Sequence, residues 1–457
     1  MTFFQVIILK ANTRLKAVYF HFIHLKKSIM LFRFSLTLFL LPLILFVIPT
    51  SADADFFLKD IEVVGNKRTK KSVVVTELGF REKESVNHET IEQGISNLRN
   101  TNLFSTVDYR LEGKEDRKTL FIDVAERWTT IPIAKLSSGG GVGQITLGVY
   151  DPNIFGQYIE AGGQYEKLGD TNSGVVWLKN PRIFGKKTGI DLQLWRTNRL
   201  RTKYEQDFDE PVVSTGFLHT RDKIFLGFTR EFSSTLTGNL FYEYNDDTFS
   251  DDLTSSEVQA IVAQKGLPPS SKIHFIGAGL GFGRINYKGF LTDGMLFDAS
   301  YRYGISKSKG IDNFRQTDLS FNYFKTIFTD ATYAQRLLAG FTTTGVLQYW
   351  YYLGGLDRIR GFADNRFAGR YFWLSNSELR VPVWRNDWAV VQTTGFIDIA
   401  STSEEFSGLD SIDGASAGLG LRVLLPKVYR FTFRLDYAEP IKNNDDRNIS
   451  FGVQQFF

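Results

Sequence analysis

Residues 236–245 read Leu-Thr-Gly-Asn-Leu-Phe-Tyr-Glu-Tyr-Asn. One set of alternate positions holds Leu, Gly, Leu, Tyr and Tyr, and the other holds Thr, Asn, Phe, Glu and Asn. A period of two is typical of a β-strand, because successive side chains of a strand point to opposite faces. One face of this strand suits lipid and the other suits water, so the stretch predicts a strand of a transmembrane β-barrel.

The same alternation recurs from about residue 130 to residue 457, and we expect no helix in this region. Residues 297–303 and 431–437 repeat it most clearly. An even number of antiparallel strands closes a barrel and removes its edges. We therefore predict an all-β, 16-stranded antiparallel barrel over residues 130–457. The candidate strands start near residues 131, 143, 156, 173, 188, 214, 235, 273, 294, 314, 332, 371, 388, 413, 428 and 447.

The composition agrees with a barrel and argues against several other classes of protein. Aromatic residues make up 15% of the 457 residues, yet the mean hydropathy is only −0.16. A helical membrane protein would be more apolar, because each span needs about 20 apolar residues. The net charge of +4 is too small to indicate nucleic-acid binding. Without cysteine there is no disulfide or thiolate metal site, and we expect no metal ion or cofactor.

Residues 1–54 carry a targeting signal. An apolar run over residues 34–48 follows Lys26, Lys27 and Arg33, and the small residues Ala52 and Ala54 come after it. A basic start, a short apolar run and a small-x-small site predict a secretory signal peptide. A membrane-anchor helix is the alternative. The residues before Met30 differ from the usual basic region, so we expect translation to start at Met30.

Residues 55–129 differ from the barrel and predict a small α/β domain. Alternating strands are expected over residues 57–64, 103–111 and 119–124, with helices over residues 70–78 and after residue 87. In the second helix Ile91, Ile95 and Leu98 stand at positions i, i+4 and i+7, which is one helical face. The predicted fold is therefore an α+β domain followed by the barrel.

A glycine-rich stretch lies between the eleventh and twelfth predicted strands. Residues 353–362 read Leu-Gly-Gly-Leu-Asp-Arg-Ile-Arg-Gly-Phe and end with Arg360, Gly361 and Phe362. Glycine lets a loop turn tightly and approach a wall closely. We predict that this loop enters the barrel and that Arg360 pairs there with carboxylates. A solvated surface loop with incidental charges is the alternative.

Two nearby strands carry suitable partners for Arg360. If Leu379 faces lipid, then its neighbour Glu378 faces the barrel interior, because the faces alternate. If Ile397 faces lipid, then Phe396 and Asp398 face the interior by the same rule. Charge-assisted bonds from an arginine to two carboxylates are among the stronger polar contacts. Glu378, Asp398 and Phe396 are therefore the predicted partners of Arg360.

These features together resemble the BamA/TamA superfamily of outer-membrane assembly and translocation barrels. Residues 151–156, 418–422 and 434–440 are similar to further segments of that superfamily, although Ala400 stands where many members have Gly. The order of elements in residues 55–129 looks like a single POTRA domain, a periplasmic module that binds polypeptides through a sheet edge. The resemblance also implies that Phe457 ends a C-terminal sorting signal.

The resemblance implies a non-enzymatic function in the bacterial outer membrane, with the POTRA domain in the periplasm. Expected partners are extended outer-membrane or secreted polypeptides, periplasmic chaperones or lipoproteins, and outer-membrane lipid. Residues 414–418 formally fit Gly-x-Ser-x-Gly, but they open a predicted strand and lack the strand-turn-helix context of a catalytic serine. We name no catalytic residue. The alternatives are a two-partner-type secretion pore for one exoprotein and a passive porin or receptor.

Overall fold

The computed structural model describes residues 55–114, 117–139, 142–183, 187–204, 212–442 and 448–453. They lie in one compact unit, Asp55–Phe457. The expected signal region, residues 1–54, and the terminal Phe457 lie outside the described residues. None of the helices that the structure describes combines the length and apolar character needed to cross a membrane.

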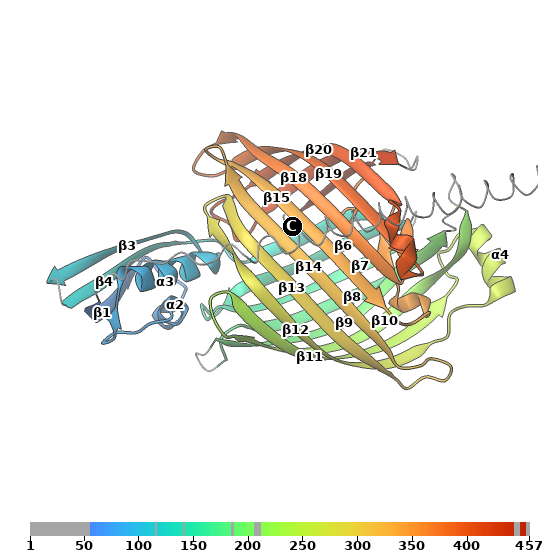
Figure 1. The fold of residues 1–457 in the computed structure, drawn as a ribbon, viewed down its shortest axis with the longest axis horizontal. Helices are drawn as coiled ribbons and strands as arrows, with labels where there is room; N and C mark the ends of the chain where they lie inside the picture. The colour runs from blue at the N-terminus through green and yellow to red at the C-terminus, as the bar shows by residue number, and fades with distance from the viewer. Residues whose placement is uncertain are drawn as a thin grey trace, which may run out of the picture. The chain divides into compact units, whose positions relative to one another are not determined.

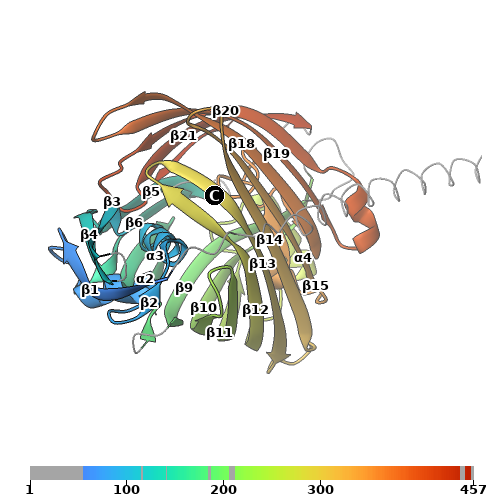
Figure 2. The same cartoon turned by 60° about the vertical axis from the view of Figure 1, so that its left-hand side comes forward.

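The N-terminal part is an α/β unit with one four-stranded sheet, in which the order is β2-β1-β4-β3. Its elements are β1 (Phe56–Val64), α2 (Lys71–Leu78), β2 (Ser85–Val86), α3 (His88–Asn100), β3 (Phe104–Lys114) and β4 (Arg117–Glu126). β1 runs parallel to β4, and β4 runs antiparallel to β3. Figure 2 shows α2 and α3 together beside this sheet.

Local sequence explains both helices. The Asn87 side chain caps α3 by accepting a hydrogen bond from the backbone N of Thr90 at 2.8 Å, which satisfies a donor at the helix start. Gly79 ends α2 in the left-handed conformation, with φ of 83°. The apolar face of α3 that the sequence predicts, Ile91, Ile95 and Leu98, is fully buried in the core of the unit.

The rest of the chain forms a nearly closed antiparallel barrel (Figure 1), which confirms the predicted fold class. Sixteen strands make up its wall within the described residues, and each begins within four residues of its predicted start. They are β5 (Ile131–Gly139), β6 (Val142–Ile154), β7 (Ile159–Leu168), β8 (Thr171–Asn180), β9 (Thr188–Tyr204), β10 (Val213–Glu231), β11 (Leu236–Ser250), β12 (Ser271–Lys288), β13 (Leu291–Ser306), β14 (Phe314–Ile327), β15 (Ala331–Thr342), β18 (Tyr371–Arg385), β19 (Val390–Ser403), β20 (Gly414–Leu424), β21 (Thr432–Lys442) and β22 (Asn448–Val453).

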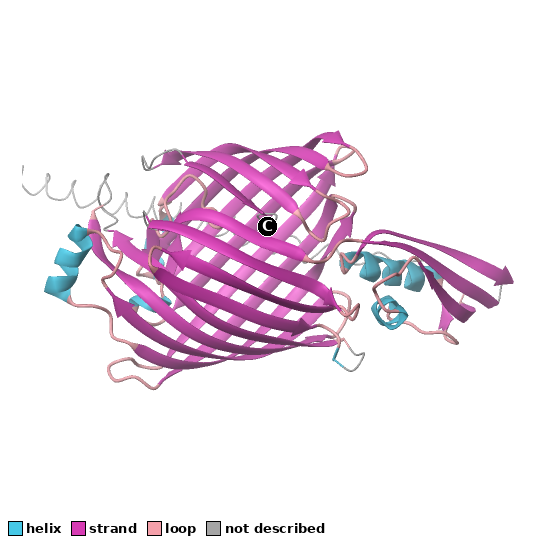
Figure 3. Ribbon diagram, turned by 180° about the vertical axis from the view of Figure 1, so that it is seen from behind, coloured by secondary structure: helices cyan, strands magenta, loops and turns pink. Residues whose placement is uncertain are grey.

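The strands obey the predicted alternation. Leu240 on β11 is 65% exposed and faces outward, whereas Glu243 and Asn245 on the same strand are buried. Charged and amide side chains thus face the interior, where they find partners, and apolar ones cover the outer wall. Figure 3 shows how fully strands dominate this part of the molecule.

The expectation of no helix after residue 130 is wrong. α4 (Ser256–Lys265) lies in the connection between β11, which ends at Ser250, and β12, which begins at Ser271. The Ser255 side chain caps α4 by accepting from the backbone N of Val258 at 3.3 Å. Val258 and Val262 are buried, and α4 lies against β10. A serine cap and two apolar residues one turn apart are too weak a signal to stand out among strands.

The barrel wall has one weak junction, which we call the seam, between β5 and β22. Within the described residues the hydrogen-bonded order runs from β22 to β5, and no ladder joins these two ends. β22 pairs with β21 over six residues, whereas β9 and β10 pair over 17. Among the residues that the structure describes, the seam is therefore the place where the wall has the fewest backbone bonds.

Candidate functional site: an arginine loop inside the barrel

The long connection between β15 and β18 folds into the barrel. It contains a 3-10 turn (Leu347–Tyr349) and two short strands, β16 (Tyr351–Leu353) and β17 (Phe367–Gly369), which pair with each other. Between them, Ile359, Arg360 and Phe362 have 1% exposure or less. A solvated surface loop, the alternative considered from the sequence, does not fit this burial.

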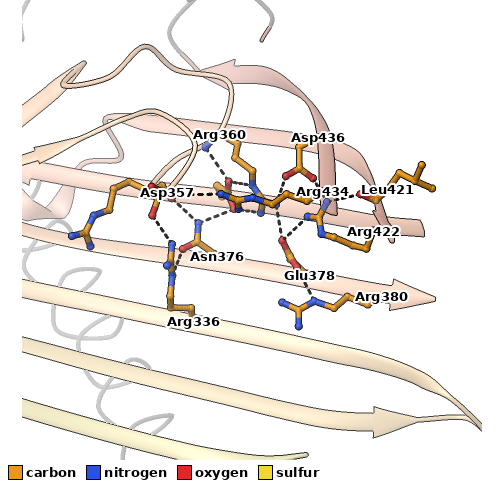
Figure 4. Close-up of polar contacts among 12 residues, drawn as sticks. Arg336, Asp357, Arg360, Asn376, Glu378, Arg380, Leu421, Arg422, Arg434 and Asp436 are labelled. Atoms are coloured by element: carbon orange, nitrogen blue, oxygen red, sulfur yellow. Dashed lines mark hydrogen bonds and ion pairs between the residues drawn. The ribbon is translucent and has the colours of Figure 1, made fainter. Parts of the chain in front are cut away.

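Arg360 binds the inner wall through its whole guanidinium group (Figure 4). Its Nε and Nη2 atoms each donate to a different oxygen of Asp398 at 2.8 Å, and Nη1 donates to Glu378 Oε1 at 2.6 Å. The backbone N of Arg360 also donates to Asp398, at 3.1 Å. The guanidinium carbon lies 3.5 Å from the centroid of the Phe396 ring. The structure thus brings Arg360 together with all three side chains proposed as its partners.

Gly361 allows this close approach. Its φ of +88° is a conformation that side-chain-bearing residues rarely adopt. A Cβ atom at this position would lie 3.3 Å from Ala438 Cβ and 3.4 Å from Ser416 Cβ, on two strands of the wall. The adjacent Phe362 packs against Phe367 with ring centroids 5.1 Å apart. The motif residues therefore fix the loop against the wall on one side and against its own hairpin on the other.

Sequence reasoning missed several wall residues that complete the site. Arg380 Nε donates to Glu378 Oε2 at 2.9 Å. Arg422 Nη1 lies 2.7 Å from Asp436 Oδ1, an ion pair without hydrogen-bond alignment. We call the set the anchor patch, which consists of Arg360, Glu378, Arg380, Asp398, Arg422 and Asp436. Three positive and three negative side chains balance within it, so no uncompensated charge is buried.

The wall residues that sequence reasoning missed do have a recognisable sequence pattern. Leu421 and Leu435 are exposed on the outer wall, so the neighbouring Arg422 and Asp436 must face inward by alternation. Strand register then brings them together, because Gly420, two residues before Arg422, stands opposite Asp436. The parity argument that places Glu378 and Asp398 inside also applies to β20 and β21.

The same loop reaches a different part of the wall. Tyr349 donates from its hydroxyl to Asp247 Oδ2 on β11 at 2.6 Å, and Arg221 Nε on β10 donates to Asp247 Oδ1 at 2.6 Å. Further along, Arg201 on β9 donates to Asn365 at 2.6 Å. β9 stands seven places from β18 in the order of sixteen strands. The loop therefore spans the lumen between nearly opposite walls.

Comparison with known families shows to which family the chain belongs. Residues 153–457 match the model of the Omp85 superfamily domain. The chain belongs to the Omp85 superfamily. Residues 56–127 match the model of the POTRA domain, described as a surface antigen variable number repeat. These matches confirm the resemblance on which the sequence-based prediction rests.

Solved structures share the Omp85 fold at low identity. BamA from Haemophilus ducreyi lacking POTRA domains 1–3 is 16% identical, with a TM-score of 0.51, over 88% of this chain and 84% of that one. CdiB from Escherichia coli is 16% identical, with a TM-score of 0.62, over 87% and 76%. CdiB from Acinetobacter baumannii is 14% identical, with a TM-score of 0.57, over 87% and 73%. No curated protein sequence matches significantly.

The POTRA domain is attached to the rim of the Omp85 barrel by a partly buried arginine. Arg182, in the turn between β8 and β9, binds both oxygens of Glu77 on α2 at 2.5 and 2.8 Å and Glu231 at the end of β10 at 2.5 Å. Burial acts to lower the pKa of Arg182, but the hydrogen bond and charge of Glu77 outweigh it and raise that pKa above its ordinary value. The arginine therefore stays charged and holds two carboxylates together.

Other rim turns add contacts to the POTRA domain. Arg284 on β12 donates to Asn97 of α3 at 2.7 Å, and the backbone N of Tyr287 donates to Asn100 at 3.1 Å. Arg68 of the POTRA domain donates to Asp151 on β6 at 2.8 Å. The two helices and the β1–α2 connection thus contact the barrel. The outer edge of β3 makes none of these contacts.

A cavity of about 1260 Å³ lies in the lumen of the Omp85 barrel, lined by the loop, by the first five strands of the wall and by its last strands. Its lining includes Lys135 on β5, Arg434 on β21, Gly452 on β22 and the loop residues Leu356 and Asp357. The cavity therefore reaches both end strands of the seam and contacts the loop.

Proposed function

We propose that this chain handles polypeptides at the bacterial outer membrane, either inserting them into the membrane or translocating them across it. The observation that carries the proposal is the seam of an Omp85 barrel, where β5 and β22 have no ladder between them in the described part of the chain. Edge strands present unpaired backbone N–H and C=O groups, which another strand can pair with. A client strand would enter the wall or the lumen at this point.

The POTRA domain, in the periplasm, would capture the client before the seam. β1 is covered at its start by β2, and the backbone N of Lys83 donates to Leu58 O at 2.7 Å. β3 has its ladder partner, β4, on one side only in the described residues. An extended chain would add to the outer edge of β3 through main-chain hydrogen bonds, a mode of recognition that tolerates many sequences.

The direction of the backbone groups along β3 identifies the residues that would receive the client. Arg99 Nη2 donates to the carbonyl oxygen of Val107 at 2.8 Å, so the Val107 carbonyl points away from β4. Backbone groups alternate in direction along an antiparallel strand. The N–H and C=O groups of Tyr109 and Leu111 therefore point to the free edge, where a client strand would bind.

The remaining assignments follow from this role. Translation would start at Met30, and the signal peptide within residues 1–54 would direct export and be removed. Residues 55–129 would form the capturing domain and residues 130–457 the barrel, with Phe457 ending the signal for its own insertion. The chain would act without catalysis or cofactor. Periplasmic chaperones or lipoproteins would deliver the clients to it.

Depletion followed by complementation tests the proposal. Cells depleted of the chain should lose specific polypeptides from the outer membrane or the medium, measured by quantitative proteomics, and the wild-type gene should restore them. Arg360→Ala should restore fewer of them, although its own barrel still reaches the membrane. Arg360→Lys, which keeps the charge but not the two-pronged bond to Asp398, should fall between the two.

Two variants at the POTRA edge sharpen the same experiment. Leu111→Pro removes the outward N–H and should reduce client delivery, because proline has no backbone donor. Leu111→Ala removes the same side chain but keeps the donor, so it is the matched control and should complement fully. Unchanged client levels in depleted cells would contradict the proposed function. High steady conductance to small solutes with no client loss would support a passive porin.

A further inference from the structure

The part of the loop just before Arg360 lies on the seam. Asp357 Oδ1 receives a hydrogen bond from Arg434 Nη2 on β21 at 2.9 Å, and Asp357 Oδ2 lies 3.9 Å from Lys135 Nζ on β5. β21 carries the last strand, β22, whereas β5 is the first strand. One carboxylate of the loop therefore attracts cations on both sides of the seam.

The neighbouring residue covers the last strand itself. A Cβ atom built on Gly452 of β22 would lie 3.3 Å from Leu356 Cδ2, so Leu356 packs directly on the inner face of β22. A larger residue at position 452 would displace it. Leu356 and Asp357 thus contact β22, β21 and β5 from the lumen, and both line its cavity.

The anchor patch sets the position of these two residues. Arg360, fully buried among its carboxylates, is only three residues from Asp357. The chain between them is held as well, because Asn376 Nδ2 donates to Arg358 O at 2.9 Å and Arg336 Nη2 donates to Asp357 O at 3.1 Å. A backbone fixed at these points cannot carry Asp357 away from the seam while Arg360 stays bound.

We propose that Leu356 and Asp357 form a latch that holds β5 and β22 together from inside, and that Arg360 positions this latch. The proposal rests on the proposed function for its purpose, since a latch is useful only if the seam opens to a client. The side chain of Asp357 is 69% exposed, so each of its ion pairs is weak and is screened by salt. A weak latch is what an incoming strand can displace.

Hydrogen exchange of the purified full-length chain in phospholipid nanodiscs tests the latch without any client. Asp357→Lys places a cation beside Lys135 and Arg434, and we expect roughly tenfold faster exchange in peptides covering residues 131–139 and 448–453, because attraction becomes repulsion. Peptides from β18 and β19 should exchange as in the wild type. Lys135→Glu, which faces Asp357 with a like charge, should also speed exchange at the seam.

The double variant Asp357→Lys with Lys135→Glu restores an opposite-charge pair across the seam and should return exchange most of the way to the wild-type rate. Arg358→Ala removes an exposed charge from the next position of the loop and is the control that should change nothing. If Asp357→Lys does not fold, Asp357→Asn decides instead, with an expected increase of roughly twofold.

Seam peptides that exchange at the wild-type rate in the folded Asp357 variants would overturn the latch. So would a double variant that exchanges as fast as the faster single variant or faster, because the opposite charges would then have rescued nothing. Neither result depends on client handling. If the depletion experiment contradicts the proposed function while exchange follows the expected pattern, the latch is supported and only its purpose is rejected.

Discussion

The anchor patch and the seam lie on the same barrel wall, yet they are held by very different forces. At the anchor patch, Arg360, Glu378 and Asp398 are buried completely, and the ladder between β18 and β19 extends over most of both strands. At the seam no ladder is present among the described residues, and a largely exposed Asp357 joins the two sides. The loop is therefore fixed firmly at the anchor patch, and its Asp357 side chain makes weak contacts at the seam.

Burial explains the difference in strength. A buried ion pair that loses one partner leaves a charge without water or counter-charge, which costs several kcal/mol. An exposed pair that breaks returns both groups to water and costs about 0–1 kcal/mol. A single loop can therefore hold Arg360 firmly in place while the ion pairs of the Asp357 side chain, three residues away, break easily. This division suits the proposed opening of the seam to a client.

The largest effect on the free energy of unfolding is expected from removing Arg360 from the anchor patch. Arg360→Ala leaves Glu378 and Asp398 buried without their main cation, and it should lower the free energy of unfolding by about 3–5 kcal/mol. Asp357→Asn, on the weak side, should lower it by less than about 1 kcal/mol. Urea unfolding in lipid vesicles, followed by tryptophan fluorescence, measures both. Equal effects of the two substitutions would remove the distinction between the two regions.

An intermediate effect is expected at the second wall that the loop reaches. Tyr349→Phe removes the hydroxyl donor from the buried Asp247, which keeps its bonds from Arg221 and from His219 Nε2, 2.8 Å away. The free energy of unfolding should fall by about 1–2 kcal/mol. The same unfolding assay measures it. A loss as large as that of Arg360→Ala would show that the loop has two equal anchors.

The smallest effect needs no substitution. Raising the salt concentration from 0.15 to 1 M shortens the screening length from about 8 to about 3 Å. Exchange at residues 131–139 and 448–453 should then rise roughly twofold, since the ion pairs of Asp357 are open to solvent. Exchange in β18 and β19 should not change. A uniform rise over the whole barrel would assign the salt effect to something other than the seam.

Much of the fold follows from the sequence because barrel strands are a local pattern. Each strand shows its own alternation, so the starts of all sixteen could be placed without knowledge of their neighbours. The inward direction of Glu378 and Asp398 follows from the same rule, as would that of Arg422 and Asp436. The helix α4 was missed because its signal, a serine cap and two valines one turn apart, is short and lies within a polar connection.

The contacts of the loop were beyond such reasoning for a physical reason. The place of Asp357 beside Lys135 and Arg434 depends on the path of residues 343–370 through the lumen, and no repeat in the sequence encodes that path. It is set by tertiary contacts, such as those of Tyr349 with Asp247 and of Asn365 with Arg201. Pairings between distant segments of this kind have to be read from the structure.

The central claim is that client polypeptides meet this barrel at its seam, and photo-crosslinking in living cells tests it most directly. A photoreactive amino acid at Ala134 on β5 would stand at the seam, and the same amino acid at Leu240, on the outer face of β11, is the control far from it. We predict crosslinks to outer-membrane or secreted polypeptides from position 134 and none from position 240. No polypeptide adduct at position 134, or equal adducts at both positions, would contradict the account.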